Sequence, residues 1–329
     1  MEIPLKTLDV VSICNALIDL LIQAEESDIQ SLDLNKGIMH LVDADRQKTV
    51  LSHFEGHETT TQLGGSCLNA IRTLAALDAK TAFAGMIGPD AFGKNIREKM
   101  SALGIQAALK EHKNEDTGTC AVLITPDGER TMNTNLGASC LFDESIVPEQ
   151  EIKNSNIFHF CGYQWSSPEQ IKAIETAIKI GRSSNTLISF DVADPFVVQN
   201  CREDFKKIID SDTDVVFANE EESKMLYDSS PEEAAAKISA SGAIAVIKLG
   251  AKGALIQRGE EVVKVSAEPT TVVDTTGAGD MFAAGFLYGL SKDKDLATCG
   301  KMAAIAAGDT ISHIGASVGD AAIRKIKDL

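Results

Sequence analysis

From about residue 150 onward, short β-branched runs alternate with longer segments of helical periodicity. This alternation is typical of βαβ crossovers, which place parallel strands in one sheet and helices on both of its faces. It predicts an α/β fold whose ligands bind at the carboxyl ends of the strands. The expected strands are 9–13, 81–87, 120–125, 157–161, 186–191, 215–218, 244–249 and 254–257. The expected helices are 66–77, 91–103, 168–181, 203–210, 231–240, 278–290 and 296–311.

Two segments depart from this rhythm. Residues 19–62 mix short apolar runs with polar turns, and residues 106–137 are predicted to form hairpins around the turn signal Pro126-Asp127-Gly128. Paired into a small sheet standing off the core, they would suit a lid over a site, although edge hairpins of the main sheet give the same pattern. No internal repeat or flexible linker interrupts the chain, so we expect residues 1–329 to form one domain with this lid as a subdomain.

The composition excludes several classes of function. The 329 residues carry a formal net charge of −17, which argues against nucleic acid as a partner because a phosphate backbone needs a basic face. No apolar run approaches the ~20 residues of a membrane span, and the segment 1–6 lacks the pattern of a signal peptide. The seven cysteines form no Cys-x-x-Cys pair and several lie in apolar runs, which indicates reduced, buried thiols and a cytoplasmic location. The histidines and cysteines show no metal-ligand spacing, so a structural zinc site is not expected.

The stretch Asp274-Thr275-Thr276-Gly277-Ala278-Gly279-Asp280 runs into a long apolar helix pattern. A glycine-rich turn at a helix start leaves backbone N–H groups unpaired, and the helix dipole makes such a site suitable for a phosphate. A carboxylate beside a phosphate is unfavourable unless it has a chemical role, and the expected role of Asp280 is to accept a proton from a hydroxyl that attacks the phosphate. An ordinary strand–turn–helix junction capped by aspartate gives the same pattern.

Three further motifs lie at predicted strand ends. Gly64-Gly65-Ser66-Cys67-Leu68-Asn69 lets the backbone approach a ligand and directs Asn69 toward it, or is simply a turn and helix cap. Asn219-Glu220-Glu221-Glu222 could hold Mg²⁺ through water, or form an acidic helix start. The turn Gly250–Gly253 could lie along a nucleotide or close a plain hairpin. The stretch 88–95 nearly matches the P-loop sequence pattern. Asn95 stands where a Ser or Thr must hold Mg²⁺, so a P-loop is not expected there.

Taken in order, these motifs resemble the ribokinase-like (PfkB) family of sugar and nucleoside kinases, over nearly the whole chain from Cys14 to Ala316. The stretch 274–280 is the most specific part of the match, and 88–93 resembles the Gly-x-Asp-x-x-Gly stretch of that family. The resemblance implies a three-layer α/β/α core with a mostly parallel sheet and a small β-sheet lid. It implies ATP and Mg²⁺ as cofactors, with K⁺ or Na⁺ in some members. It also leaves open a monomer or a homodimer formed through the lid.

The resemblance also implies a role for each matched residue. Asp280 matches the catalytic base, and the amides of Gly277, Ala278 and Gly279 match the anion hole. Acceptor binding is implied for Asp19, Gly64, Gly65 and Asn69, with Arg130 of the lid hairpin reaching substrate or phosphate unless it forms a surface ion pair. ATP binding is implied for Asn219, Gly250, Gly253, Thr276 and Gly279, Mg²⁺ binding through water for Glu222, and a monovalent cation near Asp274.

Within the family, Asn15-Ala16-Leu17-Ile18-Asp19 and Gly-Gly-Ser-x-x-Asn resemble the adenosine-kinase-like branch, although Cys14 and Ala16 depart from its usual glycine and proline. We therefore expect ATP-dependent phosphorylation of a primary hydroxyl of a sugar or nucleoside, with adenosine favoured. A simple sugar kinase for ribose, fructose or a sugar acid is the main alternative; a non-catalytic regulator and a structural dimerisation unit are the others. Aromatic residues available to wall an adenine are Phe160, Tyr163, Trp165 and Phe196, whose default interpretation is core packing.

Overall fold

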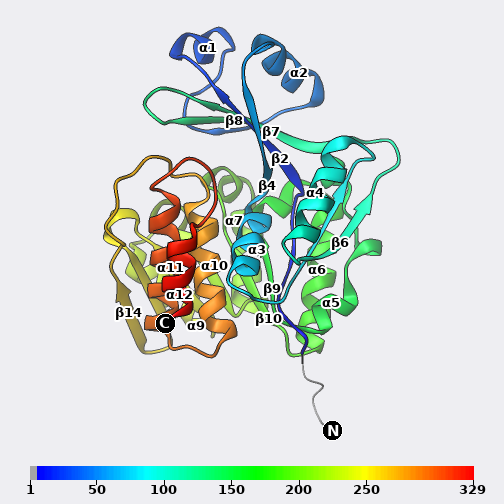
Figure 1. Cartoon of the computed structure of the whole chain (residues 1–329). Helices are drawn as coiled ribbons and strands as arrows, with labels where there is room; N and C mark the ends of the chain where they lie inside the picture. The colour runs from blue at the N-terminus through cyan, green and yellow to red at the C-terminus, as the bar shows by residue number, and fades with distance from the viewer. Residues whose placement is uncertain (1–5) are drawn as a thin grey trace.

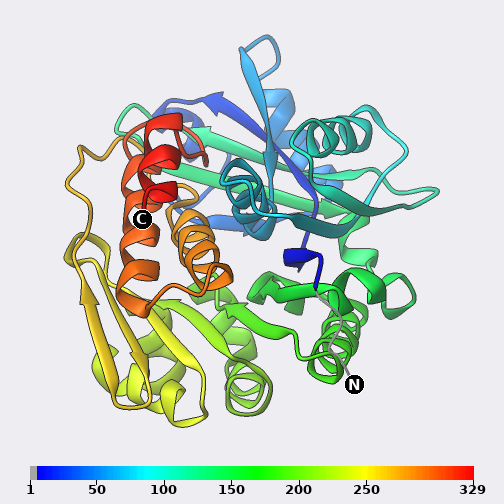
Figure 2. The ribbon, with the colours of Figure 1, turned by 60° about the horizontal axis from the view of Figure 1, so that its bottom comes forward.

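The computed structural model describes residues 6–329, so the segment 1–5, on which much of the signal-peptide expectation rests, lies outside the described residues. Most of the chain builds one nine-stranded sheet in the order β14-β13-β12-β11-β10-β9-β1-β5-β6. The strands from β12 to β6 in this order pair in parallel, and β13 and β14 add an antiparallel edge beside α11 (Figures 1 and 2). Strand bounds are β1 Leu8–Ile13, β5 Thr81–Ile87, β6 Gln106–Glu111, β9 Ser155–Cys161, β10 Leu187–Asp191, β11 Val215–Asn219, β12 Ile244–Lys248, β13 Ala254–Arg258 and β14 Glu261–Val265.

Both faces of this sheet are covered by helices, because successive residues of a strand point to opposite faces. Val10 and Phe217 pack into one apolar cluster, with α3, α4, α10 and α11, whereas Val11 and Val216 pack into the other, with α5 to α9. The expected three-layer α/β/α core is confirmed. Helix bounds are α3 Ser66–Ala76, α4 Ala91–Ala102, α5 Glu149–Lys153, α6 Pro168–Ser183, α7 Pro195–Asp212, α8 Glu220–Tyr227, α9 Pro231–Ala240, α10 Ala278–Ser291, α11 Leu296–Thr310 and α12 Asp320–Lys327; short 3₁₀ turns are η1 Ala138–Leu141, η2 Glu144–Ile146, η3 Gly162–Ser166 and η4 Gly250–Lys252.

A second, five-stranded mixed sheet forms the lid, in the order β3-β8-β7-β2-β4, and stands above the core in Figure 1. Two short helices cover its outer face through an apolar cluster that includes Ile29, Val50 and Phe54. The alternation of β2 turns Leu17 and Asp19 to the other face, which lines a cavity. Bounds are β2 Leu17–Gln23, α1 Glu26–Ser31, β3 Met39–Leu41, α2 Ala44–His53, β4 Thr59–Gly64, β7 Thr117–Ile124 and β8 Arg130–Gly137.

Two expectations about elements were wrong in extent. Residues 106–111 were expected in the lid, but they form β6, which pairs in parallel with β5 at the edge of the main sheet. The hairpin of the segment 106–137 is the β7–β8 pair, closed by a turn in which the Gly128 amide donates to the Thr125 carbonyl. Helix α7 begins at Pro195 rather than at residue 203, because the Asp194 side chain caps it by accepting from the Phe196 amide.

Within residues 6–329, no helix is both long enough and apolar enough to cross a membrane.

Candidate active site

A cavity of about 730 Å³ lies between the lid and the carboxyl ends of the core strands. It is lined by Asp19 and Arg130 from the lid side, and by Asn69, Glu222 and Asp280 from the core. This size suits a small organic ligand. Among the other residues predicted for the site, it is also lined by Gly65, Asn219, Gly250, Asp274, Thr276, Gly277 and Gly279.

Asp280 lies in the first turn of α10, where two side chains of α3 hold its carboxylate. Ser66 Oγ donates to Oδ1 at 2.6 Å, and Asn69 Nδ2 donates to Oδ2 at 3.0 Å. Burial raises the pKa of Asp280 to about 7, and the two hydrogen bonds oppose this rise. The carboxylate is thus fixed in orientation and titrates near neutrality, as a general base requires. Ser66 as a partner of Asp280 was not predicted.

The turn before α10 forms a cradle of backbone amides. Gly277 caps the helix with φ of +73°, and a Cβ there would lie 2.4 Å from the Cβ of Ala316. The amides of Gly277 and Gly279 have no hydrogen-bond partner among the described residues, whereas the Ala278 amide donates to the Thr275 carbonyl at 3.2 Å. Two of the three amides predicted for an anion hole are therefore available to an anion.

Lys248, the last residue of β12, stands beside this cradle and was not predicted as a site residue. Its Nζ would lie 3.1 Å from a Cβ on Gly279, and it donates to both carboxylate oxygens of Asp191 at 3.1 and 3.2 Å. Burial lowers the pKa of Lys248, but the carboxylates of Asp191 and Glu222 outweigh burial and hold it above its usual value. The side chain is therefore a fixed cation next to the free amides. The sequence signal that could have identified Lys248 is a charged residue at the end of each of two buried strands, Lys248 in β12 and Asp191 in β10.

Asn219 and Glu222 form a reciprocal cap at the start of α8. Glu222 accepts from the Asn219 amide and from Asn219 Nδ2, both at 2.7 Å, and the Glu222 amide donates to Asn219 Oδ1 at 2.8 Å. Burial raises the pKa of Glu222 to about 7. These contacts fit the second alternative given for this motif, an acidic helix start, with Asn219 as its cap. Because both carboxylate oxygens already accept hydrogen bonds, these contacts favour a metal held through water over direct ligation.

Arg130 and Asp274 form a buried ion pair between the lid and the core, with side chains 6% and 3% exposed. Arg130 therefore forms an ion pair, as the alternative interpretation held, but the pair is buried and does not lie on the surface. Asp274 also accepts from the Thr276 amide at 3.0 Å and the Gly315 amide at 2.8 Å. Since the guanidinium already neutralises this carboxylate, its contacts do not fit a potassium ion bound directly to Asp274.

Asp19 and the glycines before α3 form the lid side of the site. A Cβ on Gly64 would lie 2.1 Å from Asp19 Oδ1, and a Cβ on Gly65, at φ of +99°, would lie 2.3 Å from the Asn15 carbonyl oxygen. Burial raises the pKa of Asp19 to about 6, against the opposing charges of Arg72 and Arg130. No donor bonds the Asp19 carboxylate among the described residues, which leaves it free to accept hydrogen bonds from a ligand.

The remaining predicted residues divide between the cavity and its surroundings. The turn Gly250–Lys252 closes the antiparallel β12–β13 pair and brings Gly250 to the cavity wall. Gly253 supports this turn from outside the cavity lining, since a Cβ there would lie 1.9 Å from the Val265 carbonyl oxygen. Asp90, within the near-P-loop stretch, caps α4 by accepting from the Gly93 amide and also accepts from the Thr117 amide, both at 2.7 Å. That stretch joins the core to the lid.

Of the four aromatic residues considered as adenine walls, three reach the cavity. Tyr163, Trp165 and Phe196 line it, and Phe196 is 53% exposed. Phe160 is fully buried and stacks against Phe158 and Phe190, with ring centroids 5.5 and 5.1 Å apart, so core packing is its role.

Known proteins share this sequence and architecture. The pfkB family of carbohydrate kinases matches residues 37–322. A probable sugar kinase from Rhizobium etli CFN 42 is 31% identical, with a TM-score of 0.92 over 98% of this chain and 99% of that one. Adenosine kinase from Sinorhizobium meliloti is 30% identical, with a TM-score of 0.91 over 98% and 99% of the two chains. Adenosine kinase 2 of Arabidopsis thaliana is 26% identical over 77% of this chain and 79% of its own length. With its sheet, lid and amide cradle, the chain belongs to the pfkB family of carbohydrate kinases and is a phosphotransferase with an alcohol group as acceptor.

Proposed function

We propose that this kinase transfers the γ-phosphoryl group of ATP to the primary 5′-hydroxyl of adenosine. The observation that carries the proposal is the apolar wall of the cavity. The lid contributes Leu17, Met39, Met132 and Leu136, which suit the faces of a purine better than the hydroxyls of a free sugar. The resemblance to proteins named adenosine kinase supports the same acceptor.

Polar groups at the cavity wall would bind the ribose. Among residues 6–329 no donor contacts the Asp19 carboxylate, which lines the cavity, so it can accept hydrogen bonds from two neighbouring hydroxyls. Gly64 leaves the space that this carboxylate occupies, and Gly65 and Asn69 line the adjoining wall. This arrangement would direct the primary hydroxyl of the acceptor toward Asp280.

In the proposed reaction Asp280 accepts the proton of the attacking hydroxyl, and its contacts with Ser66 and Asn69 hold it in place. The amides of Gly277 and Gly279, with Lys248, stabilise the charge on the transferring group. When bound, Mg²⁺–ATP supplies the electrophilic phosphorus and partial neutralisation of its phosphates. The residues proposed to hold it are Asn219, Glu222 (through water), Gly250 and Thr276, with Gly253 supporting the Gly250 turn from outside the cavity lining.

The test is phosphoryl transfer by the purified protein with Mg²⁺–ATP, with and without K⁺, against adenosine, other nucleosides, ribose, fructose and 2-keto-3-deoxygluconate. We expect the highest kcat/KM with adenosine and AMP as the product. The apolar lid face predicts that ribose alone binds poorly, because it leaves that face uncovered. A higher kcat/KM for any free sugar would contradict adenosine as the acceptor and keep the mechanism.

A simple sugar kinase is the second candidate, because a structure 31% identical to this chain is titled a probable sugar kinase. The same panel decides between the two. Turnover with any of these acceptors would exclude a purely regulatory or structural role.

The pKa of Asp280 predicts the pH dependence of the reaction. A base must be ionised to accept a proton, so kcat/KM for the acceptor should rise with pH through about 7 and level off above it. In Ser66→Ala the carboxylate loses a hydrogen bond that lowers its pKa, so the rise should move to higher pH while the plateau changes little. A pH–rate profile of both proteins checks this, and identical profiles would contradict Asp280 as the titrating base.

A further inference from the structure

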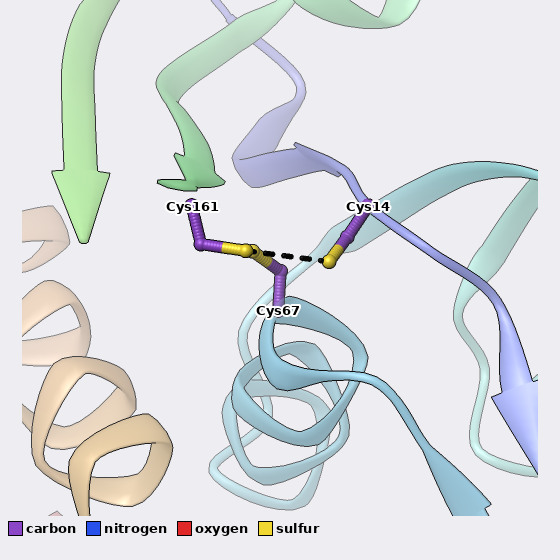
Figure 3. Close-up of side chains that lie close together, drawn as sticks. All are labelled: Cys14, Cys67 and Cys161. Carbon is purple, nitrogen blue, oxygen red and sulfur yellow. Dashed lines mark hydrogen bonds between the residues drawn. The ribbon is translucent and has the colours of Figure 1, made fainter. Parts of the chain in front are cut away.

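Three buried cysteines meet beneath the active site, although they are far apart in the sequence. Cys14 follows β1, Cys161 ends β9 and Cys67 lies in the first turn of α3, and their sulfur atoms lie within 4.8 Å of one another (Figure 3). Cys14 Sγ and Cys161 Sγ are 3.6 Å apart. No histidine, carboxylate or fourth cysteine joins the three in the part of the chain that the structure describes, so they do not form a closed, four-ligand zinc site.

Cys14 differs from the other two cysteines in its exposure to the cavity. Cys14 lines the cavity wall, although it is only 3% exposed and belongs to the same apolar cluster as Cys67 and Cys161, which do not line the cavity. The thiol of Cys161 holds the pKa of Cys14 well below its usual value, and the thiol of Cys67 and the amides of Cys67 and Asn15 contribute to this lowering. Cys14 therefore combines a lowered pKa with a position in the cavity wall, and the thiolate is the reactive form of cysteine.

The other thiols near the surface lack this combination. Cys140 and Cys201 are only half-buried, but burial raises the pKa of each. Burial thus disfavours the reactive thiolate of each, although both thiols are easier to reach than Cys14.

We propose that Cys14 is an oxidative modification site that reacts with hydrogen peroxide, and that Cys161 converts the product to an internal disulfide. The Cys14 thiolate attacks one peroxide oxygen and breaks the O–O bond. This forms the Cys14 sulfenic acid and, after one proton is taken up, water. Cys161 then attacks the Cys14 sulfur and displaces a second water, so that two thiols are oxidised and one peroxide is reduced.

The backbone geometry suits this bond. Ser12 pairs with His159 in the parallel register of β1 and β9, and Cys14 and Cys161 each lie two residues further along the chain. Neighbouring strands lie about 4.8 Å apart, within the Cα separations of roughly 4.4–6.8 Å that disulfides span. The sulfur atoms need only close from 3.6 Å to about 2.05 Å.

The disulfide would alter the active site through its neighbours. Asn15 follows Cys14 and is anchored by Gln170, whose Nε2 donates to Asn15 Oδ1 at 2.8 Å. Ser66 and Asn69 are the two hydrogen-bond partners of Asp280, and Cys67 lies between them in the sequence. Movement of Cys14 toward Cys161 changes the packing against this turn, so we expect kcat to fall several-fold and to recover when a thiol reductant is added.

The experiment treats the full-length protein with hydrogen peroxide in the presence of a metal chelator, then counts free thiols in denaturant and maps the peptides by mass spectrometry. In the wild type the count should fall by two from the seven cysteines, with a cross-linked peptide joining Cys14 to Cys161. The thiol count and the cross-link do not depend on which acceptor the kinase uses. An unchanged count, or a cross-link joining other cysteines, would overturn the proposal.

Two variants sharpen the result. Cys161→Ser should give no cross-link and should accumulate a Cys14 sulfenic acid that dimedone traps. Cys140→Ala is the matched control, since it removes a more exposed thiol outside the cavity lining and should leave the cross-link intact. If Cys161→Ser does not fold, the wild-type peptide map still decides. A dimedone adduct on Cys140 or Cys201 in place of Cys14 would contradict the assignment.

Discussion

Asp280→Asn is expected to lower kcat by about 10²–10⁴-fold, the range that a positioned general base contributes. The amide keeps the size of the side chain but cannot accept the proton of the attacking hydroxyl. Ser66 can still donate to the amide oxygen, while the Asn69 amide nitrogen would face a second donor. Asn69 Oδ1 cannot readily turn to it, because it already accepts from Arg72 Nη1 at 3.1 Å. One lost hydrogen bond costs on the order of 1 kcal/mol, so the variant should fold.

The measurements are kcat with saturating Mg²⁺–ATP and acceptor, thermal unfolding, and binding of a non-hydrolysable ATP analogue. We expect nearly unchanged unfolding and binding alongside the loss of turnover. Ser66→Ala separates the base from its support, because it retains the carboxylate and should keep most of the plateau rate at high pH. Turnover of Asp280→Asn within a few-fold of the wild type would remove Asp280 from the role of proton acceptor.

The sequence predicted the core sheet well because its strands carry local signals. Strand β5 and helix α9 have the expected bounds, and α10 begins at the predicted Ala278, since an apolar run or a capped helical pattern is sufficient to define each. The segment 106–111 was assigned to the lid because it was grouped with the hairpin around Pro126-Asp127-Gly128, and a short strand gives the same local sequence pattern in a hairpin as at a sheet edge. Only its long-range pairing with β5 decides between them.

The site was predictable where the residues that act together are close in the sequence. Asp280 and the glycines before it are contiguous, and Asn219 caps the helix three residues before Glu222. Lys248 and Asp191 escaped prediction because they end β12 and β10, with β11 between them, and only the assembled sheet brings them together. The cysteine cluster could not be predicted for the same reason, since Cys14 and Cys161 are 147 positions apart in the sequence.

Lys248→Met is expected to lower kcat/KM for ATP by about 10²–10³-fold, the effect of removing one donor that stabilises charge in the transition state. The methionine retains most of the aliphatic stem but removes the cation beside the Gly277 and Gly279 amides. It also leaves Asp191, with a side chain only 4% exposed, without its partner. A buried charge that loses its partner destabilises the fold, so the unfolding temperature should fall as well.

Lys252→Met is the matched control, because Lys252 lies only four residues away but forms a surface pair with Glu220 at 3.6 Å. Exposed pairs of this kind contribute little, so its kinetics and stability should stay near wild type. The double variant Lys248→Met/Asp191→Asn separates the two effects of losing Lys248. If the unpaired Asp191 carboxylate caused the defect, neutralising it would restore both stability and turnover. We expect the double variant to regain stability while kcat/KM stays low, because the amide cradle alone cannot replace a fixed positive charge at the phosphoryl group.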